Sequence, residues 1–231
     1  ILPLLGAILT WATRSTKLAK NIALTIASIE LALTLLIALR LFDASNGNFQ
    51  LVENYSWIPL LNIEYLIGID GISVLFLPMT ALLTIMAIIA SWNSIQYIPR
   101  FHFAFLLALE AATIGVFTAL DTTLFFLFWE LTLPPFFFLI GLWGVGSQRR
   151  NAAMKYVLYM LFGGASLLFA IVILAINHAT AVGGTIPQDL SFSLPILLET
   201  PLANNLQTLV FLLLLLGFSF KAPLVPFHSW L

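Results

Sequence analysis

Long apolar stretches constrain the fold of this chain more than any other feature of its sequence. Several of them reach the ~20 consecutive residues that a helix needs to cross the hydrocarbon core of a bilayer. Of the 231 residues, 61% are hydrophobic and 8% are charged, whereas soluble domains carry about 25% charged residues. The sequence therefore predicts an all-α, polytopic membrane protein whose surroundings include the lipid bilayer.

The apolar stretches divide into about seven segments. The first is short and is followed by cations, whereas a signal peptide carries its positive charge before the apolar core. We therefore interpret this first stretch as the tail of a transmembrane helix. The expected segments are Ile1–Trp11, Asn21–Phe42, Ile69–Trp92, Phe101–Leu120, Thr122–Trp143, Ala152–Asn177 and Leu206–His228.

The loops between these segments alternate in charge. Lys and Arg occur in the first, third and fifth loops, and the other loops carry acidic residues instead. Because cytoplasmic loops are enriched in Lys and Arg, the odd-numbered loops are predicted to be cytoplasmic and the N-terminus to lie on the outer side. The basic residues are Arg14, Lys17, Lys20, Arg100, Arg149 and Arg150, and the acidic ones are Asp43, Glu53, Glu64, Asp121, Asp189 and Glu199.

Three glutamates lie deep in the predicted segments. Glu130 is about nine residues into its segment, or ~13 Å from its start, and Glu110 is about ten residues into the preceding one. Both depths are near the middle of a ~30 Å hydrocarbon core. Their helices are joined by a short link and are expected to be antiparallel neighbours, so their carboxyl groups are placed to exchange a proton through water. Glu30 has a similar depth and its role stays open; a protonated packing role is the alternative for each glutamate.

Lys221 ends the last apolar segment and is followed by Pro223 and Pro226. A lone ammonium at membrane depth is costly and usually has a functional role. The two prolines remove backbone N–H donors and are predicted to break the helix where the charge lies. Broken helices with ion sites at the break occur in ion-translocating membrane proteins. We therefore expect an acidic partner for this lysine at the same depth.

Glu130 and Lys221 are a candidate pair for proton transfer. Burial disfavours the charged forms of both side chains, and a close opposite charge favours them. With Lys221 charged and close, Glu130 is expected to stay ionised; when the lysine moves away or loses its proton, Glu130 can accept one. Pro134 and Pro135 follow Glu130 and free backbone carbonyls, which suits a hydrated pocket. Lys155 lies near the cytoplasmic end of its segment, where it either snorkels to the surface or joins the relay.

The sequence offers no cofactor site in this chain. It contains no Cys, which excludes thiolate metal sites and iron–sulfur clusters bound by this chain. No metal-spaced His/Asp cluster or Gly-rich phosphate loop occurs, and His102 and His178 are isolated near segment ends. We expect no bound metal and no nucleic-acid partner, and the reaction that drives the pair must reside elsewhere.

The segments around these charged residues resemble the antiporter-like subunits of complex I. The motifs are LALEAATIGVF around Glu110, LFWELTLP around Glu130 and FSFKAPLVPFHSWL around Lys221. Within this family, the stretch RRNAAMKY and the later Gly163–Gly164 pair are most similar to the cyanobacterial form of chain 4 of the NAD(P)H-quinone oxidoreductase. These residues also resemble the branch of this chain that is found in carbon-dioxide-uptake versions of the complex.

The resemblance implies a fold of about fourteen helices with inverted repeats and a discontinuous seventh helix, of which this chain holds roughly the first half. Residues 1–100 then correspond to helices 1–3 with an outer-face loop, and residues 101–231 to helices 4–7 of the first repeat. It also implies that Glu130 is the channel glutamate, that Lys221 tunes it, and that Glu110 and His228 belong to the same proton relay.

By this resemblance the chain is a proton-translocating subunit of an NAD(P)H- or ferredoxin-driven quinone oxidoreductase. Such a subunit has no cofactor of its own and works with other membrane subunits, while plastoquinone and iron–sulfur clusters belong to its partners. The cyanobacterial similarity implies a thylakoid membrane, with the N-terminus on the lumenal side.

Three other interpretations remain. A subunit of a multi-chain sodium/proton antiporter shares the same motifs. A seven-helix retinal protein needs a lysine on a continuous helix, against which Pro223 and Pro226 argue. A purely structural membrane anchor leaves the mid-membrane Glu110, Glu130 and Lys221 without an explanation.

Overall fold

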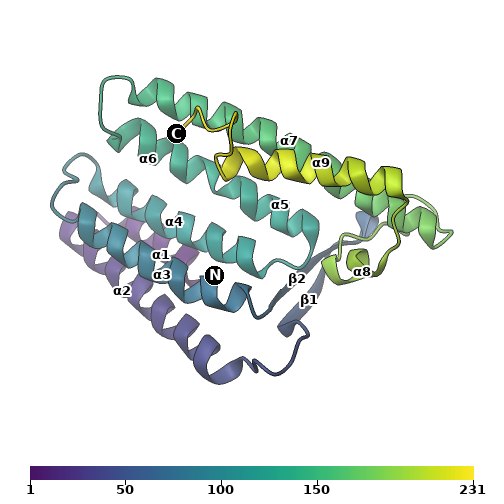
Figure 1. Ribbon diagram of the computed structural model, residues 1–231. Coiled ribbons are helices and arrows are strands. Elements are labelled where there is room, and N and C mark those ends of the chain that lie inside the picture. The colour runs from purple at the N-terminus through teal and green to yellow at the C-terminus, as the bar shows by residue number, and fades with distance from the viewer. The chain divides into compact units, whose positions relative to one another are not determined.

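A computed structural model describes all 231 residues as a helical protein with one small sheet (Figure 1). Its helices are α1 (Leu2–Ala12), α2 (Thr16–Leu36), α3 (Ser73–Ser91), α4 (Pro99–Thr118), α5 (Thr122–Leu131), α6 (Leu133–Trp143), α7 (Arg149–Ala181), α8 (Leu194–Glu199) and α9 (Asn204–Lys221). A π-helical turn, Ile37–Leu41, extends α2. The two-stranded sheet consists of β1 (Gln50–Ile58) and β2 (Ile63–Ile69).

The predicted all-α membrane fold is confirmed. Six helical segments are long and apolar enough to cross a bilayer, and the first apolar segment forms the shorter helix α1. The six are Thr16–Leu41, Ser73–Ser91, Pro99–Thr118, Thr122–Trp143, Arg149–Ala181 and Asn204–Lys221. The sequence did not predict the hairpin of β1 and β2, which occupies the loop after α2 and reverses at a turn where Asn62 has a positive φ of 56°.

By contacts between residues, the chain forms two compact units that interleave along the sequence. Unit 1 comprises Ile1–Gln50, Ile69–Thr118 and Leu131–Ala153, and unit 2 comprises Leu51–Gly68, Ala119–Glu130 and Met154–Leu231. The expected division at residue 100 concerns the boundary of a repeat and stays a prediction.

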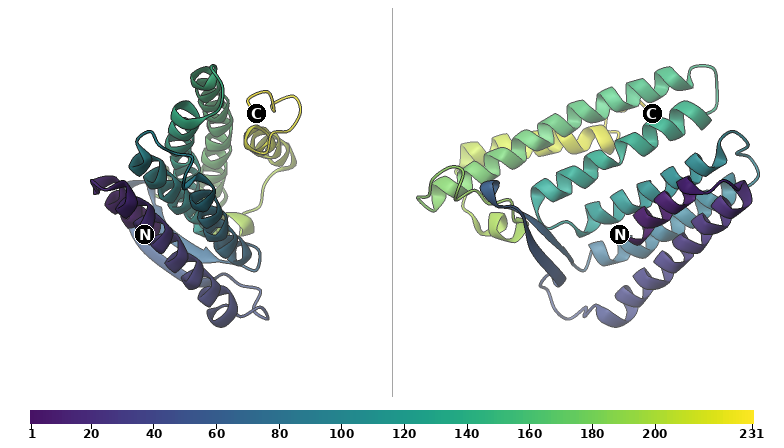
Figure 2. Two further views of the ribbon diagram at one scale, coloured as in Figure 1. Left: turned by 90° about the vertical axis from the view of Figure 1, so that its left-hand side faces the viewer. Right: turned by 180° about the vertical axis from the view of Figure 1, so that it is seen from behind.

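Unit 1 is a helical bundle in which α1, α2, α3 and α4 pack on one another (Figure 2). One face of α2 carries Ala19, Ala23 and Ala27 at a spacing of four residues, and all three are fully buried. Small residues let helix backbones approach closely. Such close packing drives helix association in membranes, because the hydrophobic effect does not favour helix contacts over contacts with lipid. The same face joins a core that includes Phe103 and Leu107 of α4.

The fifth predicted segment is interrupted, with α5 ending at Leu131 and α6 starting at Leu133. Pro134 and Pro135 occupy the first turn of α6, where proline is tolerated because its missing N–H has no helical partner. In a continuous helix these prolines would fail to bond the carbonyls of Glu130 and Leu131. The break therefore falls at Thr132, two residues after Glu130.

Unit 2 contains α7 and α9 packed against each other, side by side in Figures 1 and 2. A Cβ at Gly163 would lie 2.8 Å from Cβ of Phe220, and one at Gly217 would lie 3.0 Å from the carbonyl oxygen of Gly163. Ser166 Oγ adds a hydrogen bond of 2.8 Å to the carbonyl oxygen of Leu213. Glycines thus bring the two backbones together and a polar bond fixes their register.

Asp121 anchors the start of α5 within unit 2. Its carboxylate accepts backbone N–H groups of Thr123 at 2.8 Å, Leu124 at 2.9 Å and Glu64 at 3.1 Å. Burial raises the pKa of Asp121, although these three donors oppose the change. The sequence predicted a charged loop residue here, and the structure shows a fully buried cap that ties β2 to α5.

Candidate functional site

Glu130 and Lys221 lie together in unit 2, each at the end of a helix. Glu130 is the penultimate residue of α5 and Lys221 is the last residue of α9. The ammonium Nζ of Lys221 donates to the carbonyl oxygen of Trp129 at 3.1 Å and lies 4.0 Å from the centroid of the Trp129 ring. It is also close enough to Glu130 for the two charges to interact.

The ends of the two helices create this arrangement. The last four carbonyls of a helix have no partner within it, and at the end of α5 the carbonyl of Trp129 accepts from the ammonium of Lys221 instead. A cation at the C-terminus of α9 also suits the negative end of the helix dipole. The contact with the indole face adds a cation–π interaction, which is strongest where water is excluded. The ammonium is therefore held by three independent features.

The carboxyl group of Glu130 fits against a glycine of α7. Its Oε1 atom is buried and has no hydrogen-bond partner. A Cβ at Gly164 would overlap with Oε1 and lie 3.0 Å from Cδ of Glu130. The missing side chain of Gly164 thus makes the space that the carboxyl group occupies. A buried carboxyl oxygen without a partner is unfavourable as a carboxylate and favours water or a proton at that atom.

Two neighbours of the pair were not predicted as site residues. In the sequence Gly164 is only part of a Gly–Gly motif, and its packing against Glu130 needs the tertiary structure to be seen. Tyr156, also on α7, is buried and close enough to interact electrostatically with Glu130. Tyr156 lies eight residues, or about two turns, before Gly164 on the same helix, and this spacing indicates that both residues lie toward the same side of the helix.

After Lys221 the chain leaves the helix and folds back. Trp230 Nε1 donates to the carbonyl oxygen of Phe220 at 2.8 Å, and its ring contacts that of Tyr156 with centroids 5.2 Å apart. Residues 222–231 therefore close over the end of α9 rather than extend it. This agrees with the predicted break at the two prolines.

Lys155 and His228 are both exposed to the surroundings of unit 2. Lys155 is exposed and its ammonium donates to the backbone carbonyl of Ser229, while Tyr159 and Ser229 share a hydroxyl hydrogen bond of 2.6 Å. Lys155 thus anchors the segment that follows Lys221. His228 is exposed in that same segment. Their roles in a proton relay stay predictions.

Glu110 lies in unit 1 and is only 1% exposed. Neither of its carboxyl oxygens has a hydrogen-bond partner. It lines a cavity of about 360 Å³ between α3 and α4. Glu30 of α2 is close enough to interact electrostatically with it. His102, nearer the start of α4, makes edge contacts with the rings of Phe103 and Trp143 and has a packing role.

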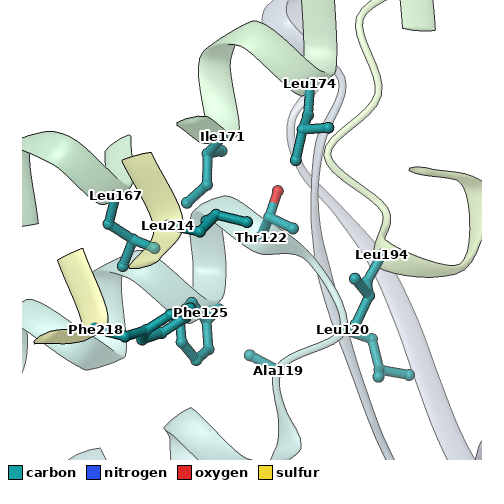
Figure 3. A pocket seen from close by; sticks show the side chains of 10 residues that line it. All are labelled: Ala119, Leu120, Thr122, Phe125, Leu167, Ile171, Leu174, Leu194, Leu214 and Phe218. Carbon is teal, nitrogen blue, oxygen red and sulfur yellow. The ribbon is translucent and has the colours of Figure 1, made fainter. Parts of the chain in front are cut away.

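Unit 2 also contains an apolar cavity of about 260 Å³ one turn from Lys221. Figure 3 shows side chains directed into it from α5, α7 and α9 and from the segment around Leu194. Thr122 is its one polar lining residue, and that hydroxyl already donates to the carbonyl oxygen of Phe192 at 2.9 Å. Such an apolar lining does not hold ordered water.

Comparison with known proteins finds similar sequences and a similar fold. The family described as NADH:quinone oxidoreductase/Mrp antiporter, TM, matches residues 119–231. NADH-quinone oxidoreductase subunit M of Escherichia coli (strain K12) is 34% identical over 244 residues, covering 100% of this chain and 47% of that protein. NAD(P)H-quinone oxidoreductase chain 4 2 of Thermosynechococcus vestitus is 37% identical over 235 residues, covering 100% of this chain and 42% of that protein.

Solved structures share the fold as well. A chain of respiratory complex I from Thermus thermophilus with bound NADH superposes with a TM-score of 0.84 at 25% identity, over 100% of this chain and 44% of that one. A chain of the Mrp complex from Dietzia sp. DQ12-45-1b gives a TM-score of 0.79 at 19% identity, over 100% of this chain and 24% of that one. The chain thus spans less than half the length of the proteins it resembles.

Proposed function

We propose that this chain is a proton-translocating subunit of a complex I-type oxidoreductase. The premise is its antiporter-like membrane fold, which is that of the NADH:quinone oxidoreductase/Mrp antiporter family matched by residues 119–231. The observation that carries the proposal is the Glu130–Lys221 pair at two helix ends within the membrane-spanning part of unit 2. Ionisable side chains at such depth mark ion pathways.

In the proposed mechanism, Glu130 is the group that gains and loses a proton. While the ammonium of Lys221 stays on Trp129 and beside Glu130, the carboxylate form is favoured. When the ammonium moves away or gives up its proton, the carboxyl group, with Oε1 buried and unpartnered, is favoured as the neutral acid. Alternation between these two arrangements loads and releases one proton per cycle. Lys155, His228 and Glu110 are proposed to carry the proton to and from this point.

The finer assignment rests on the resemblance to chain 4. We place the chain in a cyanobacterial NAD(P)H- or ferredoxin-driven plastoquinone oxidoreductase of the thylakoid membrane, with its N-terminus on the lumenal side. This agrees with 37% identity to the Thermosynechococcus chain, and the loop charges support the orientation. The chain binds no cofactor; plastoquinone and iron–sulfur clusters belong to neighbouring subunits, and their redox reaction drives the switch.

The test is a pair of substitutions in the full-length chain within its complex. We expect Glu130→Gln to reduce proton pumping per electron strongly, because the amide cannot take up the proton. Lys221→Ala should give a similar loss, because nothing then biases Glu130. The matched controls are Glu199→Gln and Lys17→Ala, which change exposed charges. A normal proton-to-electron ratio in the Glu130 variant would refute the proposal.

A second candidate is a subunit of a multi-chain sodium/proton antiporter. The likeness of fold to a chain of the Mrp complex favours it. The two functions differ in their neighbours and in what drives them. A purified particle that contains quinone-reducing subunits and pumps protons without sodium supports the oxidoreductase, whereas sodium-dependent proton exchange without electron transfer supports the antiporter.

A further inference from the structure

Unit 1 contains a buried carboxyl group that has no hydrogen-bond partner. Glu110 is 1% exposed and both of its oxygens lack partners. Asp121 is equally buried but accepts three backbone N–H groups. A buried carboxylate is tolerated when it accepts hydrogen bonds, as Asp121 does, and is unfavourable without them, as at Glu110. Glu110 therefore needs a ligand of its own, and a proton is the smallest that suffices.

The otherwise apolar lining of the cavity beside Glu110 includes three threonines, and the hydroxyl group of each already donates its proton. Thr80, Thr84 and Thr113 donate to backbone carbonyls one turn earlier, at 2.7, 3.0 and 2.8 Å. What these hydroxyls have left is lone pairs, which accept hydrogen bonds. A cavity of about 360 Å³ with such a lining has room for several waters. It suits water and the O–H of a neutral carboxylic acid, and it repels a bare carboxylate.

Glu30 supplies the second acid. It lies on α2, which packs against both α3 and α4. Ala27 and Leu107, about one turn before Glu30 and Glu110, belong to the same buried cluster, and the two carboxyl groups are close enough to interact electrostatically. The other packed helices of unit 1, α1, α3 and α6, carry no ionisable side chain. The nearest ones along α2 and α4, Lys20, Arg40 and His102, are eight or more residues away in sequence, which is roughly 12 Å or more. No side-chain cation thus neutralises the two acids.

We propose that Glu30 and Glu110 form a two-carboxyl site that holds a single proton against the threonine-lined cavity of unit 1. Two carboxylates in one poorly solvated site cannot both ionise, so the pair keeps one proton and titrates as a unit. The site lies in unit 1, whereas the Glu130–Lys221 pair lies in unit 2, and the proton that it holds does not depend on the proposed pumping role. It assigns a function to Glu30, whose place in the sequence pattern suggested none.

The test is infrared spectroscopy of the purified complex with the full-length chain carrying Glu130→Gln, so that this acid makes no contribution. We expect a band of a protonated carboxylic acid at neutral pH that shifts on exchange into D₂O. Adding Glu110→Gln should remove it. Adding Glu30→Gln should shift the band in frequency and lower the pH at which it disappears, because the remaining acid loses the neighbouring charge that added to the effect of burial. Glu53→Gln, an exposed control, should leave it unchanged.

Four outcomes would overturn the proposal. A band that survives Glu110→Gln belongs to another acid, and one that Glu30→Gln leaves unchanged means that Glu110 holds the proton alone. Loss of the band when sodium replaces potassium at constant pH would make this a metal-cation site. Thr84→Val keeps both acids and removes one acceptor, so the band should shift in frequency. An unchanged frequency would separate the acids from the cavity and refute the site as described.

Discussion

Gly164 gives the sharpest test of how the Glu130 carboxyl group is held. Non-bonded carbon atoms prefer a separation of about 3.5–4.0 Å, and a Cβ at position 164 would lie 3.0 Å from Cδ of Glu130. In the Gly164→Ala variant, the carboxyl group must therefore retreat by at least about 0.5 Å. Overpacking of this kind costs about 1–3 kcal/mol. A displacement of about 1 Å at a reacting group can lower a rate about 100-fold, so we expect a large loss of pumping.

The assay compares Gly164→Ala with Gly141→Ala in the full-length chain, measuring proton pumping per electron and thermal stability in detergent. Gly141 is the matched control, since an added Cβ there would lie at an ordinary 3.5 Å from Cβ of Ala153. We also expect Glu130→Ala to restore the melting temperature that Gly164→Ala lowers, because removal of the carboxyl group removes the overlap. If both glycine variants pump and melt alike, the carboxyl group does not lie against Gly164 and the reasoning fails.

Three smaller changes test other parts of the structure. Asp70→Ala should cost about 1 kcal/mol, because Asp70 Oδ1 accepts the N–H of Ser73 at 2.7 Å near the start of α3. Burial raises the pKa of Asp70, but hydrogen bonds from Ser73 and its neighbour outweigh burial and lower it. The stability that the Asp70 carboxylate contributes is therefore present above its ordinary pKa of about 3.9 and is lost as pH falls through the lowered pKa of the folded state. Melting curves of the two proteins that stay equally separated at low pH would contradict this. Lys155→Met should expose residues 222–231 to limited proteolysis, because the contact with Ser229 is lost; an unchanged digestion pattern would show that this lysine is no anchor. Ser166→Ala removes the hydrogen bond to Leu213 and should lower thermal stability by the equivalent of about 0.6 kcal/mol, and a larger loss would mean that the substitution disturbs more than one bond.

Sequence reasoning was accurate where the physics is local. A segment of about 20 apolar residues in a bilayer must form a helix, because its backbone groups have no other partners there. Lys221 and the following prolines likewise located the end of α9, since a missing N–H breaks a helix wherever the helix lies. The same kind of reasoning missed β1 and β2, because pairing in a hairpin depends on the partner strand more than on single-residue preferences.

For the candidate site residues, the sequence likewise predicted position along the chain but not the contacts of each side chain. Depth in the membrane follows from counting residues, so the sequence was sufficient to identify Glu110, Glu130 and Lys221 as ionisable residues within the apolar segments. Lys155 has the same charge as Lys221, yet it contacts the backbone of Ser229. Which way a side chain points depends on how its helix is rotated and on what packs against it, and the segment's own composition does not specify that.

The sequence by itself determined the membrane class, the helices and the costly charges within them, because transfer into lipid is a property of each segment alone. The tertiary structure decided that Trp129 holds the ammonium of Lys221, that Gly164 makes room for Glu130 and that Glu30 lies near Glu110. These contacts join residues on different helices. They depend on close packing between backbones, which small residues permit and which only the folded arrangement specifies.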